Sequence, residues 1–262
     1  MNYENVRLYG SAPYRTVLVH GGPGAVGEMA AVARELASSC GLVEALQTML
    51  SVDSQIEELK AVINAHADLP VTLVGHSWGA WLAFMLAARY PELVRKLILI
   101  GSAPFTVEYA DTVEKTRLNR LGDDGIIALK KLLADADDPD SVGHNHAIEA
   151  IGALFASADD YDPFEYDGSD IEFRQDIFHS VWPEAAALRQ NGKLISFAEH
   201  IQCPVLALHG DYDPHPAAGV TEPLAAHLQD FRFILLEKCG HKPWLERHAR
   251  DHFFELMNEE IK

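Results

Sequence analysis

The stretch Gly75-His76-Ser77-Trp78-Gly79 decides the fold, because it has the pattern G-x-S-x-G between two apolar runs of different kinds. Residues 71–74 (VTLV) predict a buried strand, and residues 80–88 (AWLAFMLAA) predict a helix that is apolar on every side. Glycines before and after Ser77 leave room where a strand-to-helix turn is sharpest. A bare G-x-S-x-G match also occurs in ordinary loops, but this context favours a nucleophile elbow with an exposed serine hydroxyl.

Strand-like and helix-like segments alternate along most of the chain, which predicts the α/β class with a doubly wound, mostly parallel sheet. The expected strands are 16–19, 42–47, 71–74, 97–100, 205–208 and 231–236. Apolar residues at helical spacing mark the intervening helices. The first of these helices carries Met29, Val32, Ala33 and Leu36, and the second carries Ile56, Leu59 and Ile63. Another helix is expected near residues 224–228, and the last is expected to begin at about Trp244.

The alternation stops between residues 103 and 198, where the sequence becomes acidic and helical. We therefore expect a core domain formed by residues 1–102 and 199–262 and a helical lid inserted at 103–198. An insert that follows the carboxyl end of a parallel strand lies over the edge at which α/β proteins bind their ligands.

A serine hydroxyl becomes a good nucleophile only when a base takes its proton and a carboxylate orients that base. His241 follows a predicted strand within residues 238–241 (KCGH), and it is the predicted base. The turn after the preceding strand carries Asp211 and Asp213, and we favour Asp213 as the acid. Taken alone, each of these aspartates also fits a turn-capping role. The order Ser77, Asp213, His241 is the order expected for a nucleophile elbow on a parallel sheet.

Residues 20–24 (HGGPG) follow the first predicted parallel strand, where a loop of oxyanion donors belongs. Pro23 has no backbone N–H, so the predicted donors are the N–H groups of Gly22 and of Trp78, the residue after the serine. A phosphate-binding loop is the alternative, but the sequence contains neither G-x-x-x-x-G-K-[ST] nor G-x-G-x-x-G here.

These motifs extend from His20 to Trp244, and together they resemble those of the α/β-hydrolase fold family. Ser77, Asp213 and His241 match the catalytic triad of that family. The HGGPG loop with a tryptophan after the serine resembles the proline iminopeptidase branch and its related amidases, esterases and lactonases. That branch often has glycine where this chain has His76. It also has a longer region ending in D-Q-R-G, which shrinks here to residues 46–48 (LQT). The resemblance therefore implies hydrolysis and leaves the substrate class open.

Composition excludes several other functions. The chain has 262 residues, is 48% hydrophobic and 23% charged, and carries 21 basic against 39 acidic side chains. A formal charge of −18 disfavours nucleic acid and anionic membrane surfaces as partners. Three cysteines without a C-x-x-C pair predict a reducing compartment. Residues 1–7 lack a basic start followed by an apolar stretch, so we expect a cytoplasmic protein.

The predicted lid is acidic and aromatic. Residues 105–200 contain 20 acidic and 8 basic side chains. In proline iminopeptidases, lid carboxylates hold a free amino terminus, so the resemblance implies a substrate with an ammonium group; a solvated surface is the ordinary alternative. The aromatics form lid core or line a pocket, with Trp182 the first candidate for a substrate contact. They are Phe155, Tyr161, Phe164, Tyr166, Phe173, Phe178 and Trp182.

Two further signals have ordinary explanations. His144 and His146 form an H-x-H in a polar loop without a convincing third metal ligand. Cys239, two residues before the predicted base, is expected to be a small packing residue.

The sequence thus predicts a serine hydrolase without cofactor or metal that cleaves an ester or amide bond of a small molecule or short peptide through an acyl-enzyme. Proline iminopeptidase-like activity is one form of this prediction. A small-ester, lactone or carbon–carbon bond hydrolase is an alternative. A ligand-binding receptor that keeps the triad with little turnover is an alternative of another class.

Overall fold

A computed structural model describes residues 5–136, 144–166 and 168–262 of the chain. The strands are β1 Val6–Tyr9, β2 Tyr14–Val19, β3 Ala25–Val26, β4 Gly41–Ala45, β5 Val71–His76, β6 Val94–Ile100, β7 Glu172–Phe173, β8 Val205–Gly210 and β9 Phe231–Leu236. The helices are α1 Ala30–Leu36, α2 Val52–His66, α3 Trp78–Arg89, α4 Ala110–Ala136, α5 His144–Asp159, α6 Gln175–Gln190, α7 Lys193–Ser196, α8 Ala218–His227 and α9 Arg250–Glu260. Short 3₁₀ turns lie at Pro91–Leu93, Val107–Tyr109, Phe197–His200 and Pro243–Leu245.

In the described residues, seven strands form the main sheet in the order β1-β4-β2-β5-β6-β8-β9. All neighbours in this sheet are parallel except β1, which pairs antiparallel with β4. After β2 the chain adds β4 on one side of that strand and then adds β5, β6, β8 and β9 on the other side, so the switch point of the sheet lies between β2 and β5. In α/β sheets, the loops at the carboxyl ends of the strands beside such a switch point usually form the ligand site. The predicted doubly wound, mostly parallel α/β fold is confirmed.

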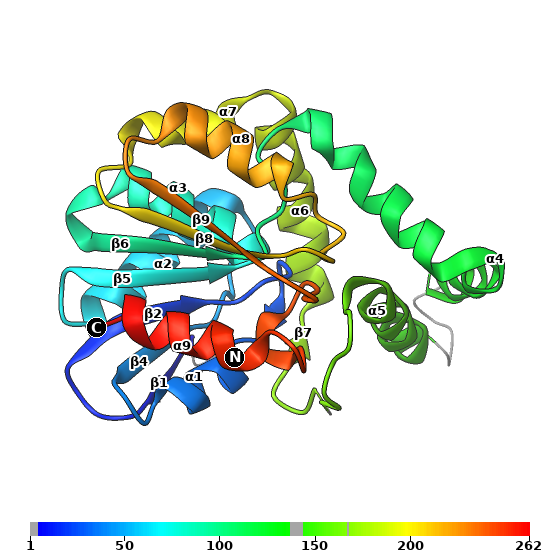
Figure 1. Cartoon of the computed structure of the whole chain (residues 1–262), viewed down its shortest axis with the longest axis horizontal. Helices are drawn as coiled ribbons and strands as arrows, with labels where there is room; N and C mark the ends of the chain where they lie inside the picture. The colour runs from blue at the N-terminus through cyan, green and yellow to red at the C-terminus, as the bar shows by residue number, and fades with distance from the viewer. Residues whose placement is uncertain (1–4, 137–143, 167) are drawn as a thin grey trace.

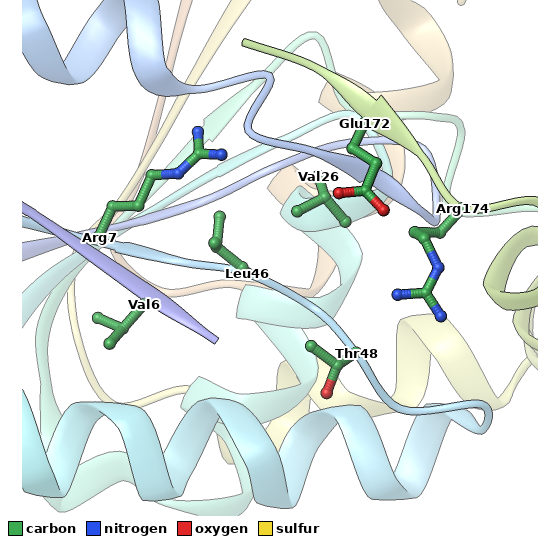
Figure 2. A pocket seen from close by; sticks show the side chains of 7 residues that line it. All are labelled: Val6, Arg7, Val26, Leu46, Thr48, Glu172 and Arg174. Atoms are coloured by element: carbon green, nitrogen blue, oxygen red, sulfur yellow. The ribbon is translucent and has the colours of Figure 1, made fainter. Parts of the chain in front are cut away.

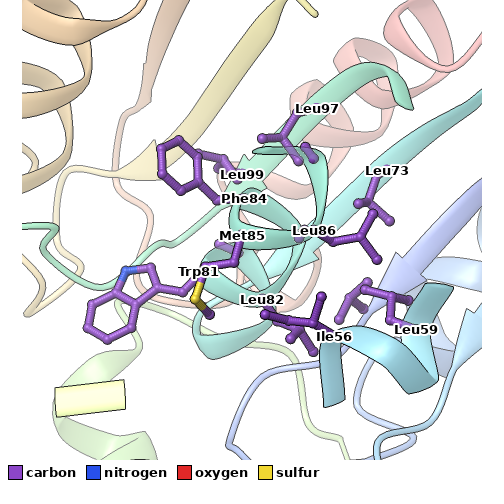
Figure 3. Close-up of a cluster of buried hydrophobic side chains, with 14 of the residues drawn as sticks. Ile56, Leu59, Leu73, Trp81, Leu82, Phe84, Met85, Leu86, Leu97 and Leu99 are labelled. Atoms are coloured by element: carbon purple, nitrogen blue, oxygen red, sulfur yellow. The ribbon is translucent and has the colours of Figure 1, made fainter. Parts of the chain in front are cut away.

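Alternate residues of the central strands pack on opposite faces of the sheet, because side chains along a strand alternate in direction. Leu73, Leu97 and Leu99 contact α2 and α3 in one buried cluster. Val74 and Ile98 join α1 and α9 in the other. Figure 3 shows the first cluster, in which Leu82 and Leu86 of α3 face Ile56 and Leu59 of α2, while Phe84 lies beside Leu99 of β6 on the other side of α3. This burial on both faces holds the loops at the strand ends in place.

Residues 103–198 lie between β6 and β8, which are direct neighbours in the sheet, so the segment is inserted without interrupting the sheet. In Figure 1, α4, α5 and α6 lie beside the edge at which the parallel strands end. Helix α4 is kinked at Gly122, whose φ is 63°. The division into a core and a separate lid domain at residues 102/103 and 198/199 stays a prediction.

Several contacts attach this insert to the rest of the chain. Strand β7 pairs with β3 directly after the HGGPG loop. The end of α5 bonds to the segment around Glu246, whose carboxylate accepts the N–H groups of Tyr161 and Asp162. Helix α6 buries Ile177 and Val181 in the core beside α3. The insert is therefore attached both next to the HGGPG loop and next to the segment that follows His241.

The sequence analysis missed or misplaced several local elements. It did not predict the antiparallel edge strand β1 or the two-residue pair β3 and β7. The last helix begins at Arg250 and not at Trp244, because Pro243 starts a 3₁₀ turn and Glu246 binds the N–H of Gly240. His144 and His146, predicted in a polar loop, lie in the first turn of α5. In the described parts of the chain, no helix combines the length and apolar character that a membrane crossing requires.

Candidate active site

Ser77 lies in a strained turn between β5 and α3, with φ 52° and ψ −116°. A non-glycine residue rarely adopts such a positive φ, and strain of this kind clusters at functional sites. The N–H of Ser77 bonds to the carbonyl of Ile100 at 2.9 Å, which fixes the turn to β6. A Cβ at position 75 would collide with the carbonyl of Gly79, and one at position 79 with that of Val19. These contacts require both glycines of the motif.

Asp213 and His241 face each other from the loops that follow β8 and β9. Oδ2 of Asp213 lies 2.7 Å from Nδ1 of His241, and both residues are buried. The ring of His241 lies 4.7 Å, between centroids, from the ring of His76, the neighbour of Ser77. The structure therefore brings the predicted acid and the predicted base together, and the base contacts the residue that precedes Ser77.

The two candidate carboxylates have different surroundings. Asp211 is exposed, and its carboxylate accepts the N–H of Cys239 at 3.0 Å, which is a turn-capping contact. Asp213 contacts imidazoles instead. The geometry favours Asp213 over Asp211 as the partner of His241.

A histidine that the sequence analysis did not single out shares the Asp213 carboxylate. Nδ1 and the backbone N–H of His215 lie 2.7 and 2.9 Å from Oδ1 of Asp213. The rings of His215 and His241 are 4.6 Å apart, and Nε2 of His209 lies 2.7 Å from the carbonyl of His215. Burial alone would raise the pKa of Asp213, but these histidines hold it well below its usual value. Asp213 is therefore an ionised carboxylate, and each of its two oxygens contacts an imidazole nitrogen.

Burial lowers the pKa of His241 to about 4, although the charge of Asp213 opposes this shift. A neutral imidazole accepts a proton from serine, whereas an imidazolium does not. His241 is thus in the form that a general base needs throughout the neutral pH range.

This lowered pKa predicts an unusually acidic limb in the pH profile. We expect kcat/KM for an ester such as p-nitrophenyl butyrate to persist as the pH falls below 6.5, the ordinary value for histidine, and to drop only as the pH approaches about 4. The measurement is kcat/KM of the wild type across this range, with circular dichroism at each pH. A limb centred at or above pH 6.5 in folded protein would contradict the assignment of His241 as a base held neutral by burial.

The HGGPG loop, residues 20–24, lies against Ser77. A Cβ at Gly21 would come within 3.1 Å of the Cβ of Ser77. The N–H of Gly21 is already bonded to Glu28. Within the described residues, the N–H groups of Gly22 and Trp78 donate to no other protein group. The two predicted oxyanion donors are therefore free to bind a ligand oxygen.

A buried ion pair, which the sequence analysis missed, joins the HGGPG loop to the loop that carries His241. Oε2 of Glu28 accepts the N–H of Gly21 at 3.0 Å and lies 2.9 Å from Nδ1 of His76. Nε2 of His76 lies 3.1 Å from the carbonyl oxygen of His241. Both ring nitrogens of His76 therefore face hydrogen-bond acceptors. Burial would raise the pKa of Glu28, but His76 holds it well below its ordinary value.

The shortened segment after β4 also supports the site. The backbone N–H of Gln47 donates to Nε2 of His20 at 3.0 Å, and its side-chain amide donates to the carbonyl of His20 at 2.8 Å. Oε1 of Gln47 accepts from Nε1 of Trp78 at 2.9 Å. His20 accepts at Nε2 and is therefore neutral, and burial lowers its pKa to about 4. Gln47 thus connects the two segments that supply the free N–H groups.

A cavity of about 350 Å³ lies between α4, α6 and the carboxyl ends of β6 and β8. Its wall includes His215, which contacts His241, and Trp182, whose ring stacks between Trp81 and Phe178. Of the other predicted lid aromatics, Phe155 also lines this cavity. A substrate contact at Trp182 stays a prediction.

A second pocket lies beside the β3 and β7 pair. Figure 2 shows it, with a volume of about 210 Å³. None of the predicted site residues lines it. Its wall consists of Val6, Arg7, Val26, Leu46, Thr48, Glu172 and Arg174.

Among the described residues, one group has the spacing of a metal site, and it consists of Asp213, His215 and His241. The nitrogens that face Asp213 are engaged in the hydrogen bonds described above, so this group is explained by the carboxylate–imidazole contacts. Burial raises the pKa of Cys239 well above its ordinary value, which makes it a packing residue and not a nucleophile.

A parallel sheet with a strained serine after its central strand, and a buried carboxylate–imidazole pair beside it, places the protein among the hydrolases. The sequence model of the alpha/beta hydrolase fold matches residues 37–247. The chain belongs to the α/β hydrolase fold family, as the sequence resemblance predicted.

Relatives within this family have different activities. A pimeloyl-[acyl-carrier protein] methyl ester esterase of Nitrosomonas europaea is 25% identical over 213 residues, 74% of this chain and 75% of that protein. A proline iminopeptidase of Heyndrickxia coagulans is 25% identical over 204 residues, 76% of this chain and 70% of that protein. The crystal structure of VinJ superposes with a TM-score of 0.69 at 21% identity, covering 98% of this chain and 95% of that one. The structural likeness supports the fold.

Proposed function

We propose that the protein is a serine hydrolase that cleaves the ester bond of a small acyl substrate. The 2.7 Å contact between Asp213 and His241, beside the strained Ser77, carries this proposal. Relatives of both the esterase and the aminopeptidase kind agree with hydrolysis by such a site.

In the proposed reaction, Oγ of Ser77 attacks the ester carbonyl while Nε2 of His241 takes the hydroxyl proton. Asp213 holds the Nδ1–H of His241 and stabilises the imidazolium that forms. The N–H groups of Gly22 and Trp78 bind the developing oxyanion. His241 then protonates the leaving alcohol, and water activated by the same base releases the acyl group. No step requires a cofactor.

The lining of the cavity favours an ester with an apolar acyl group over an N-terminal peptide bond. Alanine, valine, leucine and aromatic side chains make up most of its wall. Glu114 on the same wall is a carboxylate that would suit a free amino terminus, and this is the observation in favour of the aminopeptidase alternative. We also place the enzyme in the cytoplasm, where its three free cysteines would stay reduced.

A labelling experiment and a substrate panel test this proposal together. We expect a fluorophosphonate probe to label the wild type at Ser77, and p-nitrophenyl butyrate to turn over faster than prolyl-naphthylamide. The measurement is mass spectrometry of the labelled peptide together with kcat/KM for each substrate. N-acetylprolyl-naphthylamide is the control for the amino terminus. Preference for the free prolyl amide would establish the aminopeptidase, and a folded protein that neither labels nor turns over any substrate would indicate a receptor.

A further inference from the structure

Arg189 lies on the wall of the cavity beside the candidate active site without a carboxylate partner. Its guanidinium carbon is 5.4 Å from the centre of the Trp81 ring. Within the described residues, it forms no ion pair and no hydrogen bond. Burial lowers its pKa, and the charge of Asp111 opposes this shift. A partly buried guanidinium of this kind has donors that only water or a ligand can satisfy.

Two other arginines of the insert have hydrogen-bond acceptors. Arg117 lines the same cavity but makes two hydrogen bonds to the carboxylate of Asp159, at 2.7 and 2.6 Å. Arg120, on the same helix, donates to the carbonyl of Ala158 at 2.8 Å. Arg189 differs from both, because within the described residues its guanidinium donates to neither a carboxylate nor a carbonyl.

One cavity wall carries both Arg189 and His215, a neighbour of the candidate catalytic pair. This wall runs from Arg189 and Trp182 on α6, past Ala103 after β6, to His215, which contacts both Asp213 and His241. Most of the wall between these points is apolar. The wall also carries Glu114 and Arg117, and Arg117 is paired with Asp159. A largely apolar cavity with one guanidinium that lacks a carboxylate partner fits a ligand with an apolar body and one anionic group.

We propose that the substrate is an ester whose acyl chain ends in a carboxylate, and that Arg189 binds this carboxylate. This inference rests on the proposed esterase function. The planar guanidinium can give a carboxylate two parallel hydrogen bonds, and the apolar surroundings strengthen such charge-assisted bonds. Arg189 thereby acts as a specificity-determining residue that selects half-esters of dicarboxylic acids over neutral esters of the same length.

The test compares matched esters that differ in one terminal group. Monomethyl glutarate, adipate and suberate are paired with methyl valerate, hexanoate and octanoate, and the readout is the ratio of kcat/KM within each pair. We expect the wild type to prefer the half-ester for at least one chain length. Arg189→Gln should lower that preference about tenfold to a hundredfold, and Arg189→Lys should retain part of it.

Lys193→Gln is the matched control, because it removes one positive charge from an exposed position just after α6. It should leave the ratio unchanged. The inference is overturned if the wild type prefers the neutral ester at every length, or if Arg189→Gln lowers both members of each pair equally.

A measurement of binding without hydrolysis tests this inference separately from the proposed function. Ser77→Ala protein is titrated calorimetrically with each of the three half-esters, with and without Arg189→Gln. If the wild type hydrolyses none of the esters, the proposed function is wrong. Binding that Arg189→Gln weakens would still support the carboxylate site, whereas a lack of binding for all three half-esters would overturn it.

Discussion

Ser77→Ala should abolish ester hydrolysis and leave the fold intact. No other side chain at the site can form the acyl-enzyme, so we expect kcat to fall on the order of 10⁵-fold or more. The hydroxyl of Ser77 makes no capping hydrogen bond to α3, so the free energy of unfolding should change by less than about 1 kcal/mol. The measurements are kcat for p-nitrophenyl butyrate and the urea unfolding curve.

Ser38→Ala, at an exposed position after α1, is the matched control and should keep full activity. Substantial residual turnover by purified Ser77→Ala protein, insensitive to a fluorophosphonate, would show that another group carries out the reaction.

Asp213→Asn should lower kcat on the order of 10³- to 10⁴-fold, because an amide cannot accept the Nδ1–H of His241 as a carboxylate does and cannot stabilise the imidazolium. Asp211→Asn should lower kcat by less than about fivefold, because Asp211 bonds to the N–H of Cys239 and not to an imidazole. The measurement is kcat and KM for both variants, with circular dichroism as a check of folding.

Comparing the two variants distinguishes a carboxylate that orients His241 from one that only supports the loop. A larger loss of kcat in folded Asp211→Asn than in Asp213→Asn would exchange the roles of the two carboxylates. Equal, small losses in both variants would mean that neither orients His241.

The sheet and the approach of Asp213 to His241 could be predicted because local patterns encode them. The strand before Ser77 and the buried helix after it appear as contiguous apolar runs, and parallel strands place the loops at their carboxyl ends along one edge. Once the order of the strands is known, the turns after β8 and β9 must lie near the turn after β5. The acid and base then follow from the residue types in those turns.

Glu28, His76 and His215 could not be identified in this way, because their contacts join segments far apart in sequence. Glu28 is one of 39 acidic residues, and nothing in its neighbours along the chain shows that it lies under Gly21 and beside His76. His215 gave no signal either, since its position on Asp213 depends on how the turn folds back. Arg189 is similarly ordinary in sequence and becomes distinctive only through the partner that it lacks.

The pair formed by Glu28 and His76 has a consequence for how the site forms during folding. It joins the loop after the first parallel strand to the carbonyl of His241 near the other end of the chain, so opening either loop would leave a buried polar group of this chain of contacts without its partner. We therefore expect the loop that carries the oxyanion donors and the loop that carries the base to become ordered together.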